Sequence, residues 1–471
     1  MPDLPQSTVV ELEDSSRTRV PAAFLMDGGS TWGQESTIGQ LAKQFLDRNA
    51  GLLRDFDVDG EVVYYGDDVC LAFETGHVTG ALPLISPTTG QVNYGALIRP
   101  RFGWQGVGQA LLHTGWRKTP DLLNLPSLPQ SDRRVPPWVL ASTVLRRLDQ
   151  LLDNLTREFQ MTEADRRRPR GRIQWGRYIE SRAARGQFLD VPCRYPELRD
   201  DEFLRGAIKA TLKKHRRSLE RERGAGPMVL RLIETCRRLL REVQDAPTVS
   251  PSAASISQIR SEQSLQRDAF ADGLEAIEWT VDDRGLAGLG ELSGLPWRLP
   301  MDSFFEAWVE AVAERFCRLR GGTLRTGREH ETVVPLSWEP PYLGSQASLR
   351  PDFVIRRDRQ TVILDAKYKS HWEELNADEW HRTRQSLREQ HRSDLLQVLA
   401  YANLADVSRV TACLLYPCHQ STWDSLSERG RLVHRAELGA GERTVKLVLA
   451  AMSMETSPDE AVRALEAAIG R

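Results

Sequence analysis

The sequence lacks the patterns that are typical of membrane, secreted or disulfide-stabilised proteins. It contains no uninterrupted apolar stretch long enough to span a bilayer. Its first residues show no basic start followed by an apolar run, so no secretory signal is recognised. The six cysteines form no CxxC pair, which argues against a disulfide framework or a zinc ribbon. We therefore expect a globular cytoplasmic protein that does not bind membranes.

The sequence also lacks an excess of charge of one sign. Its 63 basic and 65 acidic side chains give a formal net charge of −2 over 471 residues. Binding to nucleic acid would therefore depend on local basic patches and not on bulk charge. No GxxxxGKS or GxxxxGKT segment is present, so the chain has no recognisable P-loop of its own.

The hydrophobic pattern divides the chain into three predicted regions. Residues 1–137 combine short β-like runs with one amphipathic helix, which predicts a mixed α+β domain. Residues 138–296 carry apolar side chains every three to four positions and should be mostly helical, with a Ser-, Ala- and Pro-rich linker or loop near 245–262. Residues 297–471 alternate helix, strand and helix, as an α/β domain does.

The strongest chemical signal lies in residues 349–370, LRPDFVIRRDRQTVILDAKYKS. Two β-like runs flank a short polar turn, a pattern that predicts a hairpin. Asp352 opens the first run, and Asp365 and Lys367 lie in the second. Because strand side chains alternate, we expect Asp365, Lys367 and Lys369 to share one face. The hairpin should bring Asp352 and Asp365 together.

Two carboxylates that meet on a sheet repel each other unless a cation lies between them. Mg²⁺ suits such a pair because it takes a few oxygen ligands and keeps positions open for water and substrate, and Mn²⁺ is a possible substitute. The carbonyl of Ala366 could add a further oxygen ligand. Lys367 would position a nucleophile or stabilise charge that develops on a phosphate. The alternative is a solvated D-x-K triplet on a strand edge, but the apolar strand before it favours the chemical interpretation.

A predicted helix over residues 301–319 lies upstream of this hairpin. Glu306 and Glu310 are one turn apart and flank its apolar stripe. We expect Glu306 to complete the metal shell together with the two aspartates. The alternative is a solvated acidic face with Arg315 and Arg318 nearby.

A second predicted helix, residues 394–404, lies downstream. Gln397 and Tyr401 have i, i+4 spacing and so share a face, where they could bind a substrate phosphate or hold Lys367 in place. A polar stripe on an amphipathic helix is the alternative. The apolar run 410–417 that follows predicts a buried parallel strand.

Several basic residues are candidates for contact with DNA phosphates. They lie beside the hairpin, in the arginine-rich segment 381–392 and in the segment RRRPRGRIQWGRY (166–178), where aromatic residues are interleaved with arginine. The candidates are Lys369, Arg350, Arg384, Arg388, Arg170 and Arg172. A charged surface helix and a surface turn are the respective alternatives for the two segments.

The order FFEAWV, RPD, LDAKYK, QVLAYA and LLYP resembles the PD-(D/E)xK nuclease core, and the McrC family in particular. The segment from RGRIQWGRY to AIKATL resembles that family's region before the nuclease, so the resemblance spans roughly residues 95–417. It implies a C-terminal restriction-endonuclease-like α/β/α domain that cleaves double-stranded DNA. It also implies a hetero-oligomeric restriction or antiphage complex with a separate McrB-like AAA+ NTPase motor, driven by GTP or ATP and engaged by the N-terminal region.

Two other functions remain open from the sequence. The first is a self-sufficient repair or recombination nuclease, similar to RecB nuclease domains, which would cut DNA without an NTPase. The second is a DNA-binding assembly subunit with no catalytic activity, which would neither bind metal at the aspartates nor cut. The sequence does not indicate which DNA modification is recognised or what residues 1–90 do.

Overall fold

The computed structural model describes residues 8–25, 35–66, 68–115, 117–123, 125, 138–155, 158–199, 201–223, 226–249, 251–262, 268–281, 296–340, 342, 344–357, 360–369, 372, 385–407, 409–440 and 443–470. The chain forms two compact units. One combines Met1–Val139 with Gly294–Arg471, and the other is Leu140–Ser293. The first unit thus joins residues from both ends of the chain.

The N-terminal part of the first unit contains two small sheets. The five-stranded sheet has the order β1-β6-β5-β11-β7, and the three-stranded sheet has the order β2-β4-β3. Their strands are β1 (Thr8–Glu13), β2 (Arg17–Pro21), β3 (Val58–Tyr65), β4 (Asp68–Thr75), β5 (Val78–Ile85), β6 (Val92–Arg99), β7 (Asp121–Leu122) and β11 (Trp297–Pro300). β1 and β6 are parallel, so their carboxyl ends meet at one edge of the sheet.

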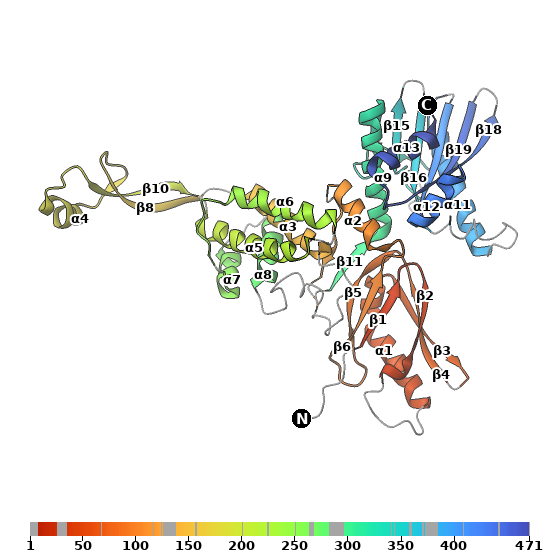
Figure 1. Cartoon of the computed structure of the whole chain (residues 1–471), viewed down its shortest axis with the longest axis horizontal. Helices are drawn as coiled ribbons and strands as arrows, with labels where there is room; N and C mark the ends of the chain where they lie inside the picture. The colour runs from red at the N-terminus through yellow and green to blue at the C-terminus, as the bar shows by residue number, and fades with distance from the viewer. Residues whose placement is uncertain are drawn as a thin grey trace. The chain divides into compact units, whose positions relative to one another are not determined.

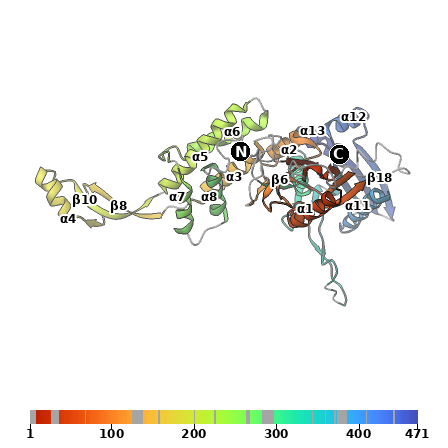
Figure 2. The ribbon, with the colours of Figure 1, turned by 90° about the horizontal axis from the view of Figure 1, so that it is seen from below.

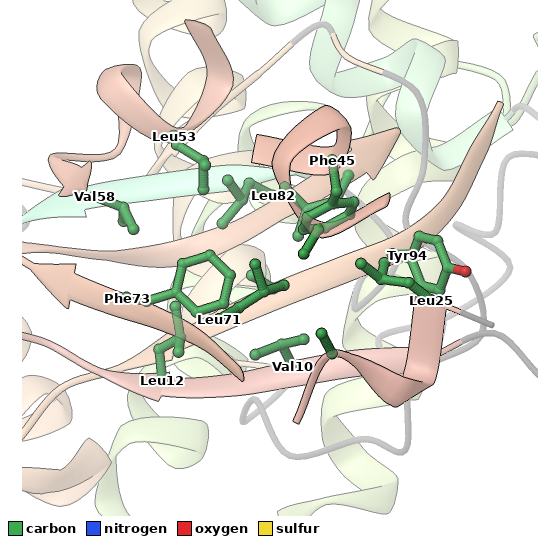
Figure 3. Packing of buried hydrophobic residues seen from close by; sticks show 14 of the residues in the cluster. Val10, Leu12, Leu25, Phe45, Leu53, Val58, Leu71, Phe73, Leu82 and Tyr94 are labelled. Atoms are coloured by element: carbon green, nitrogen blue, oxygen red, sulfur yellow. The ribbon is translucent and has the colours of Figure 1, made fainter. Parts of the chain in front are cut away.

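One hydrophobic core lies between these sheets and helix α1 (Glu35–Asp55). Figure 3 shows side chains from several strands converging on it, among them Leu71, Leu82 and Tyr94. Phe45 projects into the core from α1, the amphipathic helix expected in this region. Tyr94 meets Phe45 edge to face at 5.7 Å between ring centroids, a favoured aromatic geometry.

The C-terminal part of the first unit is built on a six-stranded sheet of order β12-β15-β16-β17-β19-β18. Its strands are β12 (Thr323–Thr326), β15 (Phe353–Arg357), β16 (Gln360–Ala366), β17 (Arg409–Pro417), β18 (Val433–Ala440) and β19 (Arg443–Met452). β16, β17 and β19 are parallel to one another. Every residue of β17 after Arg409 is buried, which confirms the buried parallel strand predicted for residues 410–417.

The described helices of this region are α9 (Met301–Arg320), α11 (Gln385–Asn403), α12 (Gln420–Glu428) and α13 (Pro458–Ile469). α9 and α13 pack against each other, and α11 packs on β16 and β17 (Figure 1). A capping box begins α13, because Ser457 Oγ accepts from Glu460 N and the Glu460 carboxylate accepts from Ser457 N. A small antiparallel pair, β13 (Val334–Pro335) and β14 (Ser348–Leu349), precedes the hairpin.

The second unit is mostly helical, as predicted. Its main helices are α3 (Trp138–Asn154), α5 (Glu202–Arg221), α6 (Pro227–Glu242), α7 (Ala253–Glu262) and α8 (Asp268–Val281). The expectation of a linker over 245–262 was wrong for its second half, which is helix α7. Ile256 on that helix is fully buried, and this burial outweighs the low helix propensity of a Ser-rich segment.

A β-ribbon within the second unit was not predicted. β8 (Glu158–Arg166) and β10 (Val191–Arg199) pair antiparallel over nine residues, with β9 (Arg172–Ile173) and the short α4 (Trp175–Arg177) between them. Figures 1 and 2 show this ribbon extending away from α3, α5 and α6, with α4 near its far end. The segment 166–178 therefore lies on the ribbon.

The combination of sheets and helices confirms the α/β class. Among the residues that the structure describes, no helix has the length and apolar character needed to cross a membrane. The division into three domains stays a prediction. The chain forms two compact units, and one of them contains both the N-terminal and the C-terminal region.

Candidate active site

The candidate site is built on the hairpin of β15 and β16. The two strands pair antiparallel with Phe353 opposite Leu364, as the sequence predicted. Asp352 immediately precedes β15, and its Oδ2 accepts a hydrogen bond of 2.8 Å from the backbone N–H of Ala366. The hairpin therefore holds the Asp352 carboxylate beside the end of β16.

Asp365 is a fully buried carboxylate. Its Oδ2 lies 2.8 Å from the Nζ of Lys367. No hydrogen-bond donor reaches its Oδ1 among the described residues. A buried carboxylate oxygen without a donor is costly unless a further positive charge is supplied. The site thus contains one negative group that its protein surroundings only partly compensate.

The electrostatics of the three central residues follow from burial and from one another. Burial raises the pKa of Asp352 well above its usual range, and the nearby charges of Asp365 and Glu306 raise it further. Burial also raises the pKa of Asp365, against the opposing effect of the Lys367 ammonium. For Lys367, burial disfavours the charged form, but the carboxylate of Asp365 holds the pKa above its ordinary value. Lys367 is therefore a cation at neutral pH.

The second lysine, Lys369, faces a different partner. β16 ends at Ala366, so the prediction that Asp365, Lys367 and Lys369 share one strand face was wrong for the two lysines. Lys367 still reaches Asp365, but Lys369 Nζ lies 2.8 and 2.9 Å from the two carboxylate oxygens of Asp394. Asp394 was not predicted from the sequence as a site residue, although it stands one helical turn before Gln397. The predicted contact of Lys369 with DNA stays a prediction.

Glu306 and Glu310 differ in their surroundings on α9. Burial raises the pKa of Glu306, and so does the charge of Glu310, while Arg350 lowers it. Glu310 is only 3% exposed and pairs with Arg117 at 3.1 Å and Arg328 at 2.9 Å. The alternative of a solvated acidic face is therefore wrong for Glu310, which is a buried structural group.

Gln397 and Tyr401 share a face of α11, as their spacing predicted. Gln397 Nε2 donates a 2.8 Å hydrogen bond to the hydroxyl of Tyr401. Burial raises the pKa of Tyr401, and the charges of Asp365 and Asp352 also raise it, so its phenol lies near the acidic pair. Their role toward substrate or Lys367 stays a prediction.

The predicted DNA-contacting arginines fall in separate places. Arg350 is exposed just before the hairpin, and Arg388 is half-buried on α11. Arg384 lies outside the described residues. Arg170 and Arg172 are exposed in the second unit, where the guanidinium of Arg170 lies 5.1 Å from the centre of the Tyr195 ring.

The donor set at Asp352 and Asp365 fits a small divalent cation. Both groups are hard oxygen ligands, which Mg²⁺ and Mn²⁺ prefer, and the unpartnered Asp365 Oδ1 offers a ligand atom. Within the part of the chain that the structure describes, no three His, Cys, Asp or Glu side chains come together as a ready-made metal site. The ligand roles of Glu306 and of the Ala366 carbonyl stay predictions.

Comparison with known proteins gives one family. The family model described as "McrBC 5-methylcytosine restriction system component" matches residues 127–417. No curated protein matches the chain. A solved structure of Thermococcus gammatolerans, a half-complex of McrB AAA+ hexamers with bound McrC, aligns over 98% of this chain and 99% of its own, with 14% identity and a TM-score of 0.42. A second, the McrBC complex of the same organism, covers 65% of this chain and 88% of its own, with 13% identity and a TM-score of 0.27.

Proposed function

This chain belongs to the family of McrBC 5-methylcytosine restriction system components, and from that premise we propose that it is the subunit that cleaves DNA. The proposed reaction is Mg²⁺-dependent hydrolysis of phosphodiester bonds in double-stranded DNA. The C-terminal part of the first unit would then be a nuclease domain of the PD-(D/E)xK type.

One observation carries the proposal: the juxtaposition of Asp352, Asp365 and Lys367 at the end of β16. A merely structural carboxylate pair would be neutralised by neighbouring donors, whereas Asp365 Oδ1 lacks one among the described residues. The cationic Lys367 beside it is only partly exposed. An acid pair and a lysine at the end of a strand could hold a metal ion and place a positive charge beside it, as metal-assisted phosphoryl hydrolysis uses.

The chain's own residues would divide the work as follows. Asp352 and Asp365 would hold Mg²⁺, which when bound would polarise the scissile phosphate and favour ionisation of the attacking water. Lys367, fixed by its ion pair with Asp365, would orient that water or stabilise negative charge on the phosphate. The backbone N–H of Ala366 keeps Asp352 in place by donating a hydrogen bond to its carboxylate.

The proposal includes a separate AAA+ motor that works through GTP or ATP. The family description names a component of a multi-part restriction system, and the sequence has no GxxxxGKS or GxxxxGKT segment with which to bind a nucleotide. A hetero-oligomeric complex, in which the motor and the DNA-cleaving subunit are different chains, follows from this. Recognition of 5-methylcytosine or of another feature of DNA would be a property of the whole complex and not of this chain alone.

The test is plasmid cleavage with Mg²⁺, with and without the AAA+ protein encoded next to this chain and NTP. We expect Lys367→Ala to lower the cleavage rate by roughly 10² to 10³-fold, the range for removing a group that stabilises transition-state charge. Lys43→Ala, a change of the same kind at an exposed position of α1, is the matched control and should keep the full rate.

The outcomes separate the candidate functions. Cutting that needs Mg²⁺, Lys367 and NTP hydrolysis by the partner supports the motor-coupled nuclease. Cutting by the isolated chain without NTP would favour a self-sufficient nuclease. Equal cutting by wild type and Lys367→Ala would refute the assignment of the site.

A further inference from the structure

The N-terminal sheet reaches the candidate site through two strand ends. β1 ends at Glu13 and β6 ends at Arg99, side by side because the strands are parallel. The residues that follow are tied together: Asp14 N donates to Arg99 O at 2.9 Å, and Arg101 N donates to the Asp14 carboxylate at 2.7 Å. Asp14 and Arg101 therefore form one fixed polar corner.

This corner holds Tyr368, the residue between the two lysines of the site. The hydroxyl of Tyr368 donates a 2.7 Å hydrogen bond to Asp14 Oδ2. The guanidinium of Arg101 donates to the main-chain carbonyl of Tyr368 at 3.0 Å and lies 4.5 Å from the centre of its ring. Asp14 is fully buried and Tyr368 is 4% exposed, so both side chains are held away from water.

Aromatic side chains enclose the Tyr368 ring on its other sides. Phe102 meets it edge to face at 5.5 Å and His77 at 5.8 Å, and Phe305 lies at 6.3 Å. Phe305 is on α9, directly before Glu306. The same ring therefore touches the N-terminal sheet and the helix that carries the third acidic candidate.

The segment that carries Lys367 and Lys369 follows the end of strand β16. The main-chain pairing of this segment with β17 reaches no further than Lys367, among the described residues. Lys367 N donates a main-chain hydrogen bond to Leu415 O, and Lys369 N donates one to Lys367 O, both at 2.9 Å. The side chains of the two lysines are held by their ion pairs with Asp365 and Asp394, and the contacts of Asp14 and Arg101 hold Tyr368 between them.

We propose that Asp14 and Arg101 are positioning residues, which fix Tyr368 and thereby set Lys367 and Lys369 at the candidate site. A buried hydrogen-bonded pair is stable only in the geometry that satisfies both groups. The N-terminal sheet thus determines where the lysine segment lies, although Asp14 and Tyr368 are 354 positions apart in the sequence. The catalytic part of this inference rests on the proposed function, whereas the structural part does not.

The first test measures the mobility of the segment. Tyr368→Phe removes only the hydroxyl, and Arg101→Met keeps the aliphatic stem but removes the guanidinium. Hydrogen exchange of the full chain should become roughly tenfold faster at residues 367–369 in both variants, since local opening follows lost hydrogen bonds, and should stay unchanged in β17. Arg99→Met is the matched control, because Arg99 pairs with Glu11 on the same strands and should leave residues 367–369 unaffected.

The second test measures DNA cleavage by the same variants in the complex with the partner. We expect the single-turnover rate to fall roughly 10 to 100-fold, as for a small displacement of a catalytic group, while DNA affinity and thermal midpoint stay close to wild type. Rescue should follow the chemistry: Arg101→Lys, which keeps a cationic donor, should retain more activity than Arg101→Met.

The results distinguish failure of the inference from failure of the proposed function. Unchanged exchange at residues 367–369 overturns the positioning role, whatever the activity. Faster exchange with an unchanged cleavage rate also overturns it, because the segment would then need no fixing. If wild type and Lys367→Ala cut equally, the proposed function fails, and the exchange data alone decide whether Asp14 and Arg101 hold the segment.

Discussion

Two buried carboxylates of the first unit show how neighbouring cations separate a structural group from a reactive one. Glu310 lies between two arginines, Arg117 and Arg328, and both of its oxygens accept from guanidinium groups. Asp365 has a single lysine at one oxygen, and its Oδ1 has no donor in the described part of the chain. We interpret Glu310 as a structural group in an ion-pair cluster and propose that Asp365 is a ligand for a metal cation.

Asp14 supplies a prediction about pH. Burial, against the opposing charge of Arg101, raises its pKa to about 6 from the ordinary value of 3.8. The folded chain therefore binds the Asp14 proton more tightly than the unfolded chain does. This preference contributes stability that is fully present below pH 3.8 and is lost as the pH rises through about 6. Asp14→Asn cannot ionise, so the unfolding free energy of wild type should fall relative to this variant between pH 4 and pH 7, by at most about 3 kcal/mol.

Urea denaturation of both proteins at several pH values measures that difference. Other raised carboxyl groups, such as Asp352 and Glu306, are present in both proteins and cancel. A difference that does not change with pH would show that Asp14 ionises as freely in the folded chain as in the unfolded one.

Among the elements, those with local signals could be predicted from the sequence. The β15–β16 hairpin, the helices around Glu306 and Gln397, and the buried strand β17 all follow from periodicity and turn residues. The β8–β10 ribbon was missed because its strands are rich in charged residues and have little apolar alternation. Helix α7 was missed because the burial of Ile256 depends on tertiary packing, which a Ser-rich segment does not indicate.

The pairing of β5 with β11 gives a prediction for an element. β11 leads directly into α9, so this pairing ties the helix of Glu306 to the N-terminal sheet. A Cβ at Gly80 would lie 2.2 Å from the carbonyl oxygen of Trp297 and 2.8 Å from the Phe56 ring. Gly80→Ala should therefore lower the unfolding free energy by about 2 kcal/mol or more.

The control for this change is Gly51→Ala. Gly51 lies within α1 with nothing within 4 Å of its Cβ position, so the added methyl group should stabilise the protein by about 0.5 to 1 kcal/mol. Thermal or urea unfolding of the two variants gives the comparison. A Gly80→Ala protein as stable as wild type would mean that β5 and β11 separate without cost.

At the scale of the whole molecule, the candidate site draws on parts of the chain that lie far apart in sequence. The acid pair and Lys367 come from one hairpin and were predicted as a local motif. Asp14, Arg101 and Asp394 were not, because hydrogen bonds such as Asp14–Tyr368 join residues that no sequence periodicity relates. One sequence can therefore indicate the reacting groups, whereas the residues that hold them depend on the folded structure.

The most direct test of the central claim is cleavage of DNA by the full complex as the Mg²⁺ concentration is varied, for wild type and for Asp365→Asn. The amide keeps the size of the side chain but removes the charge that would bind the cation. We expect wild type to show saturable dependence on Mg²⁺ and Asp365→Asn to lose at least roughly 10²-fold in rate at every concentration. Cleavage by wild type without divalent cations, or the same Mg²⁺ dependence in both proteins, would contradict the assignment of Asp352 and Asp365 as a metal-binding pair.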